Sequence, residues 1–185
     1  MIDIVDNYLP EKQFFELFNA MKDFSFYWHL SNIIAKPTSP NLLSKPNGNT
    51  LWSDNIGNMQ LCHLFYRMHE HNAYTFHLVT PILTKIDPVA VIRIKANLSL
   101  ATKEVEIGGL HIDVEDEDTP DCVRTSILYM NTNDGYTLFE DGTKVESVMN
   151  RLVTFPHTTK HAGTTCTNAP FRMVINFNYI TSNKL

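Results

Sequence analysis

Alternation of apolar and polar residues over positions 90 to 100 is the feature that most limits how this chain can fold. One face of an extended segment there would carry only apolar side chains, those of Ala90, Ile92, Ile94, Ala96, Leu98 and Leu100. The other face would carry Arg93, Lys95, Asn97 and Ser99. Because successive side chains of a strand point to opposite faces, the pattern predicts a half-buried strand with one polar face.

The segment Phe171 to Tyr179 alternates in the same way. Its apolar face suits a covering helix, and its mixed face, which suits the inside of a barrel around a polar ligand, carries Arg172, Val174, Asn176 and Asn178. Further strands are expected over Val123 to Asn131, Thr137 to Phe139 and Leu152 to Phe155, with turns at Asp134-Gly135 and Asp141-Gly142. The C-terminal half therefore predicts a β-meander or a jelly roll.

Before Pro88 the periodicity is helical. Pro10 to Met21 reads as an amphipathic helix, and a second helix is expected from a capping Thr80, with Pro81 in its first position, to Asp87-Pro88. The stretch from Ile34 to Asn58 is rich in Pro, Asn, Ser and Gly and predicts a long loop. We expect one domain over residues 1-185, with helical support over about 1-88 and a β core over about 89-180.

Composition narrows the class of partner and the compartment. The chain has 185 residues and a net charge of −5, without a basic cluster that would follow a phosphate backbone, so nucleic-acid binding is not expected. Its apolar runs fall short of the roughly 18 residues that span a bilayer, and the acidic start lacks a signal-peptide pattern. We expect a cytoplasmic protein without membrane contact, whose three cysteines are reduced.

A histidine and an aspartate suggest a metal site. His111 and Asp113 are two positions apart in Gly108-Gly109-Leu110-His111-Ile112-Asp113, so on a strand both would face one side. His161 follows a later strand, and Arg172 lies on the polar face of the last one. Two imidazoles and one carboxylate on one face are the ligand set of non-haem Fe(II) oxygenases. An arginine inside a barrel needs an anionic partner, which is either a ligand or one of the protein's own acids.

From Arg93 to Tyr179 the sequence resembles the Fe(II)- and 2-oxoglutarate-dependent dioxygenases, in particular the prolyl-4-hydroxylase-like branch. The resemblance is carried by the segments HID at 111, SILYMN at 126, DGYTLF at 134, HAG at 161 and FRMVINF at 171. It implies a double-stranded β-helix, or jelly roll, with flanking helices. It also implies that Fe(II) is bound by His111, Asp113 and His161, and that 2-oxoglutarate is held by Arg172 and Tyr129. Asn97 and Thr125 are candidates for supporting positions around the site.

The resemblance further implies hydroxylation of a substrate by O₂, with release of succinate and CO₂ and with ascorbate as a reductant. Peptidyl proline is the first expectation for the substrate, while other protein or small-molecule substrates stay open. One departure from relatives is the single glycine of Asp134-Gly135-Tyr136-Thr137, where two are common. Two alternatives also stay open, a jelly-roll metal-binding module without turnover and a zinc-dependent hydrolase that activates water.

Other candidate residues are weighed against these. His157 is four positions before His161, but Pro156 and the following threonines disfavour a helix that would bring the two together, so a loop histidine is expected. A surface or core role without a metal is expected for His63, His69, His71 and His77. The acidic run Glu115 to Asp118 is either a solvated loop or a flap that attracts a basic substrate.

Overall fold

The computed structural model describes residues 1–31, 59–114 and 121–182. The expected loop from Ile34 to Asn58 and the acidic run Glu115 to Asp118 lie outside these residues. The helical elements are α1 (Glu11–Lys22), the short 3-10 helix η3 (Phe76–Val79) and α2 (Thr80–Ile86). The strands are β1 (Asp3–Val5), β2 (His29–Ser31), β3 (Gln60–Arg67), β4 (Glu70–His71), β5 (Ala90–Leu100), β6 (Val123–Tyr129), β7 (Tyr136–Phe139), β8 (Lys144–Glu146), β9 (Arg151–Pro156), β10 (His161–Gly163) and β11 (Phe171–Ile180).

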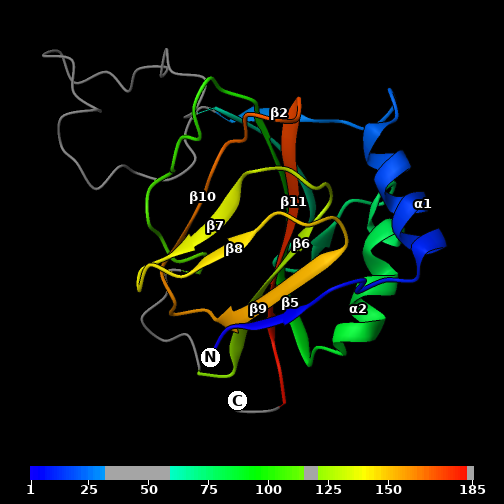
Figure 1. The fold of residues 1–185 in the computed structure, drawn as a ribbon. Helices are drawn as coiled ribbons and strands as arrows, with labels where there is room; N and C mark the ends of the chain where they lie inside the picture. Colours follow the sequence, from blue (N-terminus) through cyan, green and yellow to red (C-terminus); the bar gives the residue numbers. More distant parts are fainter. Residues whose placement is uncertain (32–58, 115–120, 183–185) are drawn as a thin grey trace, which may run out of the picture.

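Two antiparallel sheets form the core of the fold. The larger has eight strands, in the order β1-β9-β6-β11-β5-β3-β2 with β4 paired to β3, and the smaller has the order β10-β7-β8. The small sheet lies over one face of the large sheet, and α1 and α2 lie on its other side (Figure 1). This arrangement confirms the expected mainly β jelly roll with flanking helices.

The apolar face of the long strands packs under the helices. Phe14, Leu17 and Met21 of α1 join a core with Ile94 and Ala96 of β5 and with Met173, Ile175 and Phe177 of β11. A second core fills the space between the two sheets, with Ile127, Tyr129, Phe139, Val145, Val153, Phe155 and Val174. The alternation of β5 and β11 therefore sends apolar side chains to the helices and polar ones toward the small sheet, as the sequence predicts.

Several elements differ from the sequence expectation. Thr80 is the first residue of α2, and its side chain makes no capping bond, because η3 already leads the chain into the helix. The segment before Pro88 also contributes strands, of which β3 pairs directly with β5. Asp134-Gly135 does not join a β-hairpin, since β6 belongs to the large sheet and β7 to the small one. The Asp141-Gly142 turn does connect the paired strands β7 and β8.

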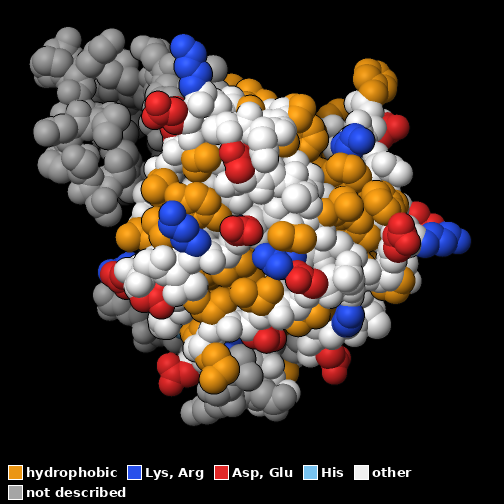
Figure 2. Space-filling view, viewed as in Figure 1, with side chains coloured by type: hydrophobic (Ala, Val, Ile, Leu, Met, Phe, Trp, Pro, Cys, Tyr) orange, Lys and Arg blue, Asp and Glu red, His pale blue; other side chains and the backbone are white. Residues whose placement is uncertain are grey.

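Surface charge and cysteines agree with the sequence. Basic and acidic side chains are interspersed on the face seen in Figure 2. All three cysteines are free thiols. Among the described residues, no helix has the length and apolar character needed to cross a membrane.

Candidate metal centre

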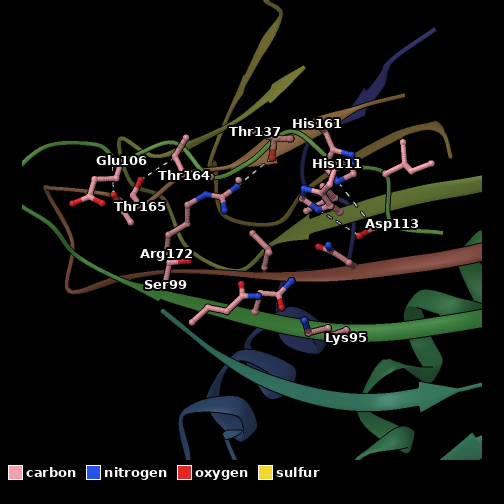
Figure 3. A pocket seen from close by; sticks show the side chains of 18 of the residues that line it. Lys95, Ser99, Glu106, His111, Asp113, Thr137, His161, Thr164, Thr165 and Arg172 are labelled. Atoms are coloured by element: carbon pink, nitrogen blue, oxygen red, sulfur yellow. Dashed lines mark hydrogen bonds and ion pairs between the residues drawn. The ribbon is translucent and has the colours of Figure 1, made fainter. Parts of the chain in front are cut away.

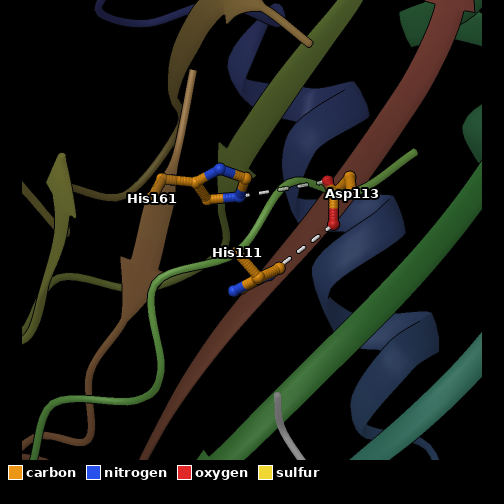
Figure 4. Close-up of side chains that lie close together, drawn as sticks. All are labelled: His111, Asp113 and His161. Carbon is orange, nitrogen blue, oxygen red and sulfur yellow. Dashed lines mark ion pairs between the residues drawn. The ribbon is translucent and has the colours of Figure 1, made fainter. Parts of the chain in front are cut away.

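Two histidines and one carboxylate meet between the sheets. His111 Nε2 lies 3.8 Å from Asp113 Oδ1, and His161 Nε2 lies 4.0 Å from Asp113 Oδ2 (Figure 4). One ligand atom from each residue can be chosen so that all three lie within 4.8 Å of one another. Within the described ranges, this is the one group of three or more His, Cys, Asp or Glu side chains close enough to share a metal ion.

A single backbone bridge brings the ligands together. His111 and His161 form an isolated antiparallel bridge, in which each backbone N–H donates to the other residue's carbonyl oxygen at 3.0 Å. Asp113 lies at a bend just after this bridge, so the expected regular strand through both His111 and Asp113 is not present. The bridge to β10, rather than strand periodicity, fixes the two imidazoles side by side, with ring centroids 4.8 Å apart.

Both imidazoles are oriented by backbone carbonyls. His111 Nδ1 lies 2.9 Å from the carbonyl oxygen of Gly109, and His161 Nδ1 lies 3.2 Å from that of Thr159. Because a carbonyl only accepts, each Nδ1 carries the proton and donates it, which leaves the Nε2 lone pair directed at the centre. Burial lowers the pKa of His161, which favours the neutral form that binds metals.

The Asp113 carboxylate is buried and doubly contacted. Its side chain is 5% exposed, and it accepts from Arg93 Nη2 at 2.8 Å and from Asn178 Nδ2 at 3.0 Å. Burial by itself would raise its pKa, but Arg93, His161, Asn178 and His111 outweigh that effect and hold the pKa below its ordinary value. The carboxylate is therefore ionised at neutral pH, as a metal ligand must be.

A small network behind Asp113 fixes the orientation of its carboxylate. Asn178 also donates to Thr125 Oγ1 at 3.0 Å and accepts from Arg93 Nε at 3.0 Å. Thr125, a candidate for a supporting position, thus acts on Asp113 only through Asn178. Sequence reasoning placed Arg93 and Asn178 on polar strand faces but did not select them, because their contact with Asp113 depends on the pairing of Arg93 with Asn178 between β5 and β11.

Loss of the Asn178 amide should weaken metal binding. In Asn178→Ala the Asp113 carboxylate loses the donor that orients it, and removal of such outer partners typically lowers metal affinity by about 10- to 100-fold. Titration of Mn(II) into the folded variant measures this change. Thr125→Val keeps the bond between Asn178 and Asp113 and should change the affinity much less. Equal losses in both variants would contradict this division of roles.

Arg172 projects from β11 into the pocket that also contains the three ligands (Figure 3). The residue is 5% exposed, and its guanidinium donates from Nε to Ser147 Oγ at 2.7 Å and from Nη2 to Thr137 Oγ1 at 3.1 Å. Both partners are neutral hydroxyls. No carboxylate of the described residues pairs with Arg172, although burial of this charge lowers its pKa and so opposes the charged form.

Tyr129 and Asn97 occupy different positions relative to this pocket. Tyr129 is fully buried beneath it, with its ring 5.4 Å from the Arg172 guanidinium, and its hydroxyl donates to Thr137 Oγ1 at 2.7 Å. It does not line the pocket, so Thr137 stands between its hydroxyl and the cavity. Asn97 does line the pocket, and its Oδ1 accepts from Cys62 Sγ at 3.4 Å.

The other histidines lie away from the centre. His157 follows β9 in a turn, as expected, and is 5% exposed with neither ring nitrogen hydrogen-bonded. His63 is a core residue whose ring nitrogens contact the carbonyl oxygen of Tyr27 and Thr75 Oγ1. None of these residues joins a group of metal-ligand side chains in the part of the chain that the structure describes.

Comparison with known proteins identifies the fold. The sequence matches no family model, and the search of curated proteins found no match. Among solved structures, the chain is similar to an oxidoreductase of the 2OG-Fe(II) oxygenase family from Burkholderia pseudomallei, with a TM-score of 0.63, 9% identity and coverage of 98% of this chain and 86% of that one.

Two prolyl hydroxylase structures are also similar. One, from Trichoplax adhaerens, is in complex with a hypoxia inducible factor peptide fragment and has a TM-score of 0.61 and 14% identity, over 99% of this chain and 84% of that one. The other is a Pseudomonas putida prolyl-4-hydroxylase with a TM-score of 0.53 and 12% identity, over 98% and 93%. The chain therefore has the jelly-roll fold found in the prolyl hydroxylases and 2OG-Fe(II) oxygenases.

Proposed function

We propose that this protein is an Fe(II)- and 2-oxoglutarate-dependent oxygenase that hydroxylates a C–H bond of its substrate. In the overall reaction one oxygen atom of O₂ enters the substrate as a hydroxyl group and the other enters succinate, while CO₂ leaves from 2-oxoglutarate. The proposal assigns the metal to His111, Asp113 and His161, and the distal carboxylate of 2-oxoglutarate to Arg172.

The observation that carries the proposal is the unpaired charge of Arg172. A guanidinium held out of water costs several kcal/mol unless an anion compensates it. The hydroxyls of Ser147 and Thr137 occupy Nε and Nη2 but carry no charge. A dicarboxylate ligand would supply the missing charge, and its planar carboxylate matches the donor geometry of arginine. A structural metal site, or a zinc hydrolase, gives no reason for this residue.

The spacing between Arg172 and the ligands suits a short dicarboxylate. A Cβ atom built on Gly163 would lie 3.5 Å from Arg172 Nη1, so the guanidinium faces this end of β10. His161 is two residues earlier on the same strand, which corresponds to about 6.6 Å along an extended chain. A ligand that contacts both ends must therefore have two polar ends separated by a short chain, as 2-oxoglutarate has.

The donor set also fits Fe(II). Two neutral imidazole nitrogens and one carboxylate oxygen on one side, with open space on the other, are the ligands typical of non-haem Fe(II) oxygenases. When bound there, Fe(II) together with 2-oxoglutarate supplies the oxidising chemistry. The chain's own residues orient and enclose: Gly109 and Thr159 hold the imidazole tautomers, and Asn178 holds the Asp113 carboxylate.

The substrate is proposed to be a protein or peptide side chain, with peptidyl proline as the first candidate. Support comes from the similar structures, one of which is a prolyl hydroxylase in complex with a peptide. At 14% identity that similarity concerns the fold, so the substrate needs its own test.

Succinate release tests the proposed reaction. The purified protein is incubated with Fe(II), ascorbate and 2-oxoglutarate, and succinate is measured against a parallel sample containing Zn(II). We expect succinate only with Fe(II), and none from the Arg172→Ala variant. Succinate formation in neither metal, with metal binding intact, would favour the non-catalytic module, and hydrolysis of ester substrates with Zn(II) would favour the hydrolase.

Gly135 should prove necessary for the position of Arg172. A Cβ added at Gly135 would lie 2.6 Å from the carbonyl oxygen of Thr165 and 2.7 Å from Arg172 Cδ, closer than real Cβ contacts allow. We expect Gly135→Ala to displace Arg172 and to weaken 2-oxoglutarate binding by roughly tenfold or more, with Mn(II) binding retained. Calorimetry with 2-oxoglutarate and Mn(II) measures both.

The matched control is Gly163→Ala. Its added Cβ would lie 3.5 Å from the same guanidinium, an ordinary van der Waals contact. This variant should therefore keep Arg172 in place and lose much less affinity. If the two variants bind 2-oxoglutarate equally well, close packing at Gly135 does not position Arg172.

A further inference from the structure

A second hollow continues from the pocket of the metal centre across the outer strands of the large sheet. It is lined by His29 of β2, by Cys62, Leu64 and Arg67 of β3, and by Arg93 and Lys95 of β5. Arg93 and Lys95 also line the pocket that contains Asp113. We call this second hollow the β2–β5 groove. A ligand lying in it can reach the metal centre at its Arg93 end.

The β2–β5 groove is basic and its charges are largely unused. Arg93 is paired with Asp113, but Lys95 and Arg67 have neither an ion pair nor a hydrogen bond among the described residues. No carboxylate lines the groove. The acidic residue across the hairpin from Arg67 is Glu70, which forms no ion pair with it. The groove therefore favours a ligand with negative charge.

Asn176 adds a second requirement for the ligand. It lies opposite Lys95 in the pairing of β11 with β5, lines the pocket, and is 8% exposed. Its Oδ1 is buried without any hydrogen-bond partner. A buried acceptor in this state costs free energy until a donor reaches it, and a peptide N–H is such a donor. The ligand should thus combine carboxylates for Lys95 and Arg67 with an N–H group for Asn176.

We propose that the β2–β5 groove binds an acidic segment of a peptide substrate, and this proposal rests on the proposed function. Lys95 and Arg67 contact carboxylate side chains of the segment, and Asn176 accepts a hydrogen bond from its backbone near the residue to be hydroxylated. Because neighbouring strands are about 4.8 Å apart, charges on β3 and β5 suit groups spread along an extended chain. A nucleic-acid strand fits less well, since the groove offers no Phe, Tyr or Trp ring for base stacking.

Peptide binding tests the groove without requiring turnover. Three labelled ten-residue peptides, identical except for glutamate, serine or lysine at alternate positions, are titrated into the full chain with Mn(II) and 2-oxoglutarate and followed by fluorescence anisotropy. We expect the glutamate peptide to bind roughly tenfold or more tightly than the serine peptide, and to weaken as salt is raised. Equal affinities for all three, or tighter binding of a ten-nucleotide DNA strand, would overturn the proposal.

Variants locate the binding to the groove. Arg67→Glu and Lys95→Gln should each lower the affinity for the glutamate peptide by about tenfold. The matched control is Lys12→Glu on the exposed surface of α1, which lies on the other side of the large sheet and should bind the peptide as the wild type does. An equal loss in the control, or no loss in either groove variant, would assign the binding to general charge or to another surface.

The same samples separate this proposal from the proposed function. Binding of Mn(II) and of 2-oxoglutarate is measured in Arg67→Glu, which lies outside the metal pocket and should be unchanged in both. If those ligands bind but the glutamate peptide has no preference, the acidic-substrate proposal fails alone. If the peptide binds in the groove but 2-oxoglutarate does not bind, the proposed function fails alone.

Discussion

Replacement of His161 by alanine is expected to remove metal binding and, with it, succinate formation. His161 supplies one of only three protein ligands, and its buried Nε2 has no other described side chain to replace it at the centre. With two ligands left, affinity for Fe(II) or Mn(II) should fall by roughly a hundredfold or more, beyond the loss typical of an outer partner. His111→Ala and Asp113→Ala should behave in the same way. Metal titration followed by calorimetry gives the result.

His157→Ala is the control for this set. The residue is buried like His161 and four positions earlier, but it lies outside the ligand cluster. A lower Tm is acceptable in this variant, because removal of a buried ring leaves a cavity. Stoichiometric metal binding should remain. Binding retained in His161→Ala but lost in His157→Ala would show that the wrong histidine had been assigned.

The second large effect is expected from Arg172→Ala. If the guanidinium pairs with the distal carboxylate of 2-oxoglutarate, removal of one partner of this buried pair should cost about 2–5 kcal/mol of binding free energy. That corresponds to a loss of roughly thirtyfold or more in affinity, with Mn(II) binding unchanged. Calorimetry of 2-oxoglutarate with the Mn(II)-loaded protein measures it. Equal affinity in wild type and variant would exclude Arg172 as the carboxylate partner.

Tyr129→Phe gives a graded comparison for Arg172. The Tyr129 hydroxyl donates to Thr137 Oγ1, which also accepts from Arg172, so its loss leaves the charge in place and disturbs only its surroundings. The cost should be on the order of 1 kcal/mol, as for one neutral hydrogen bond. A loss as large as that of Arg172→Ala would mean that the tyrosine hydroxyl itself contacts 2-oxoglutarate.

Parts of the fold with a clear local signal could be predicted from the sequence. The expected strand over residues 90 to 100 coincides with β5 (Ala90–Leu100), and the Phe171 segment differs from β11 by one residue. In both, alternation is a property of neighbouring residues and needs no knowledge of the rest of the chain. β3 (Gln60–Arg67) was missed because its outward face carries Cys62 and Leu64, so apolar residues fall on both faces.

Short pairings could not be predicted. The segment β10 (His161–Gly163) has too few residues for a periodic pattern, and the bridge of His111 to His161 is a single pair. Such pairings form because the rest of the chain brings the two segments together. The sequence therefore indicated which residues form the candidate centre by resemblance, but gave the wrong backbone for Asp113, which lies at a bend.

The sequence by itself determined the mainly β architecture, the face on which Arg172 lies, and the three candidate ligands. Only the tertiary structure decided what surrounds them: that Arg93 and Asn178 contact Asp113, that Thr137 separates Tyr129 from the pocket, and that Arg172 has no carboxylate partner among the described residues. The physical reason is the range of the interactions. Alternation reflects contacts between neighbours in the chain, whereas these contacts join strands far apart in sequence, whose register is set by packing of the whole domain.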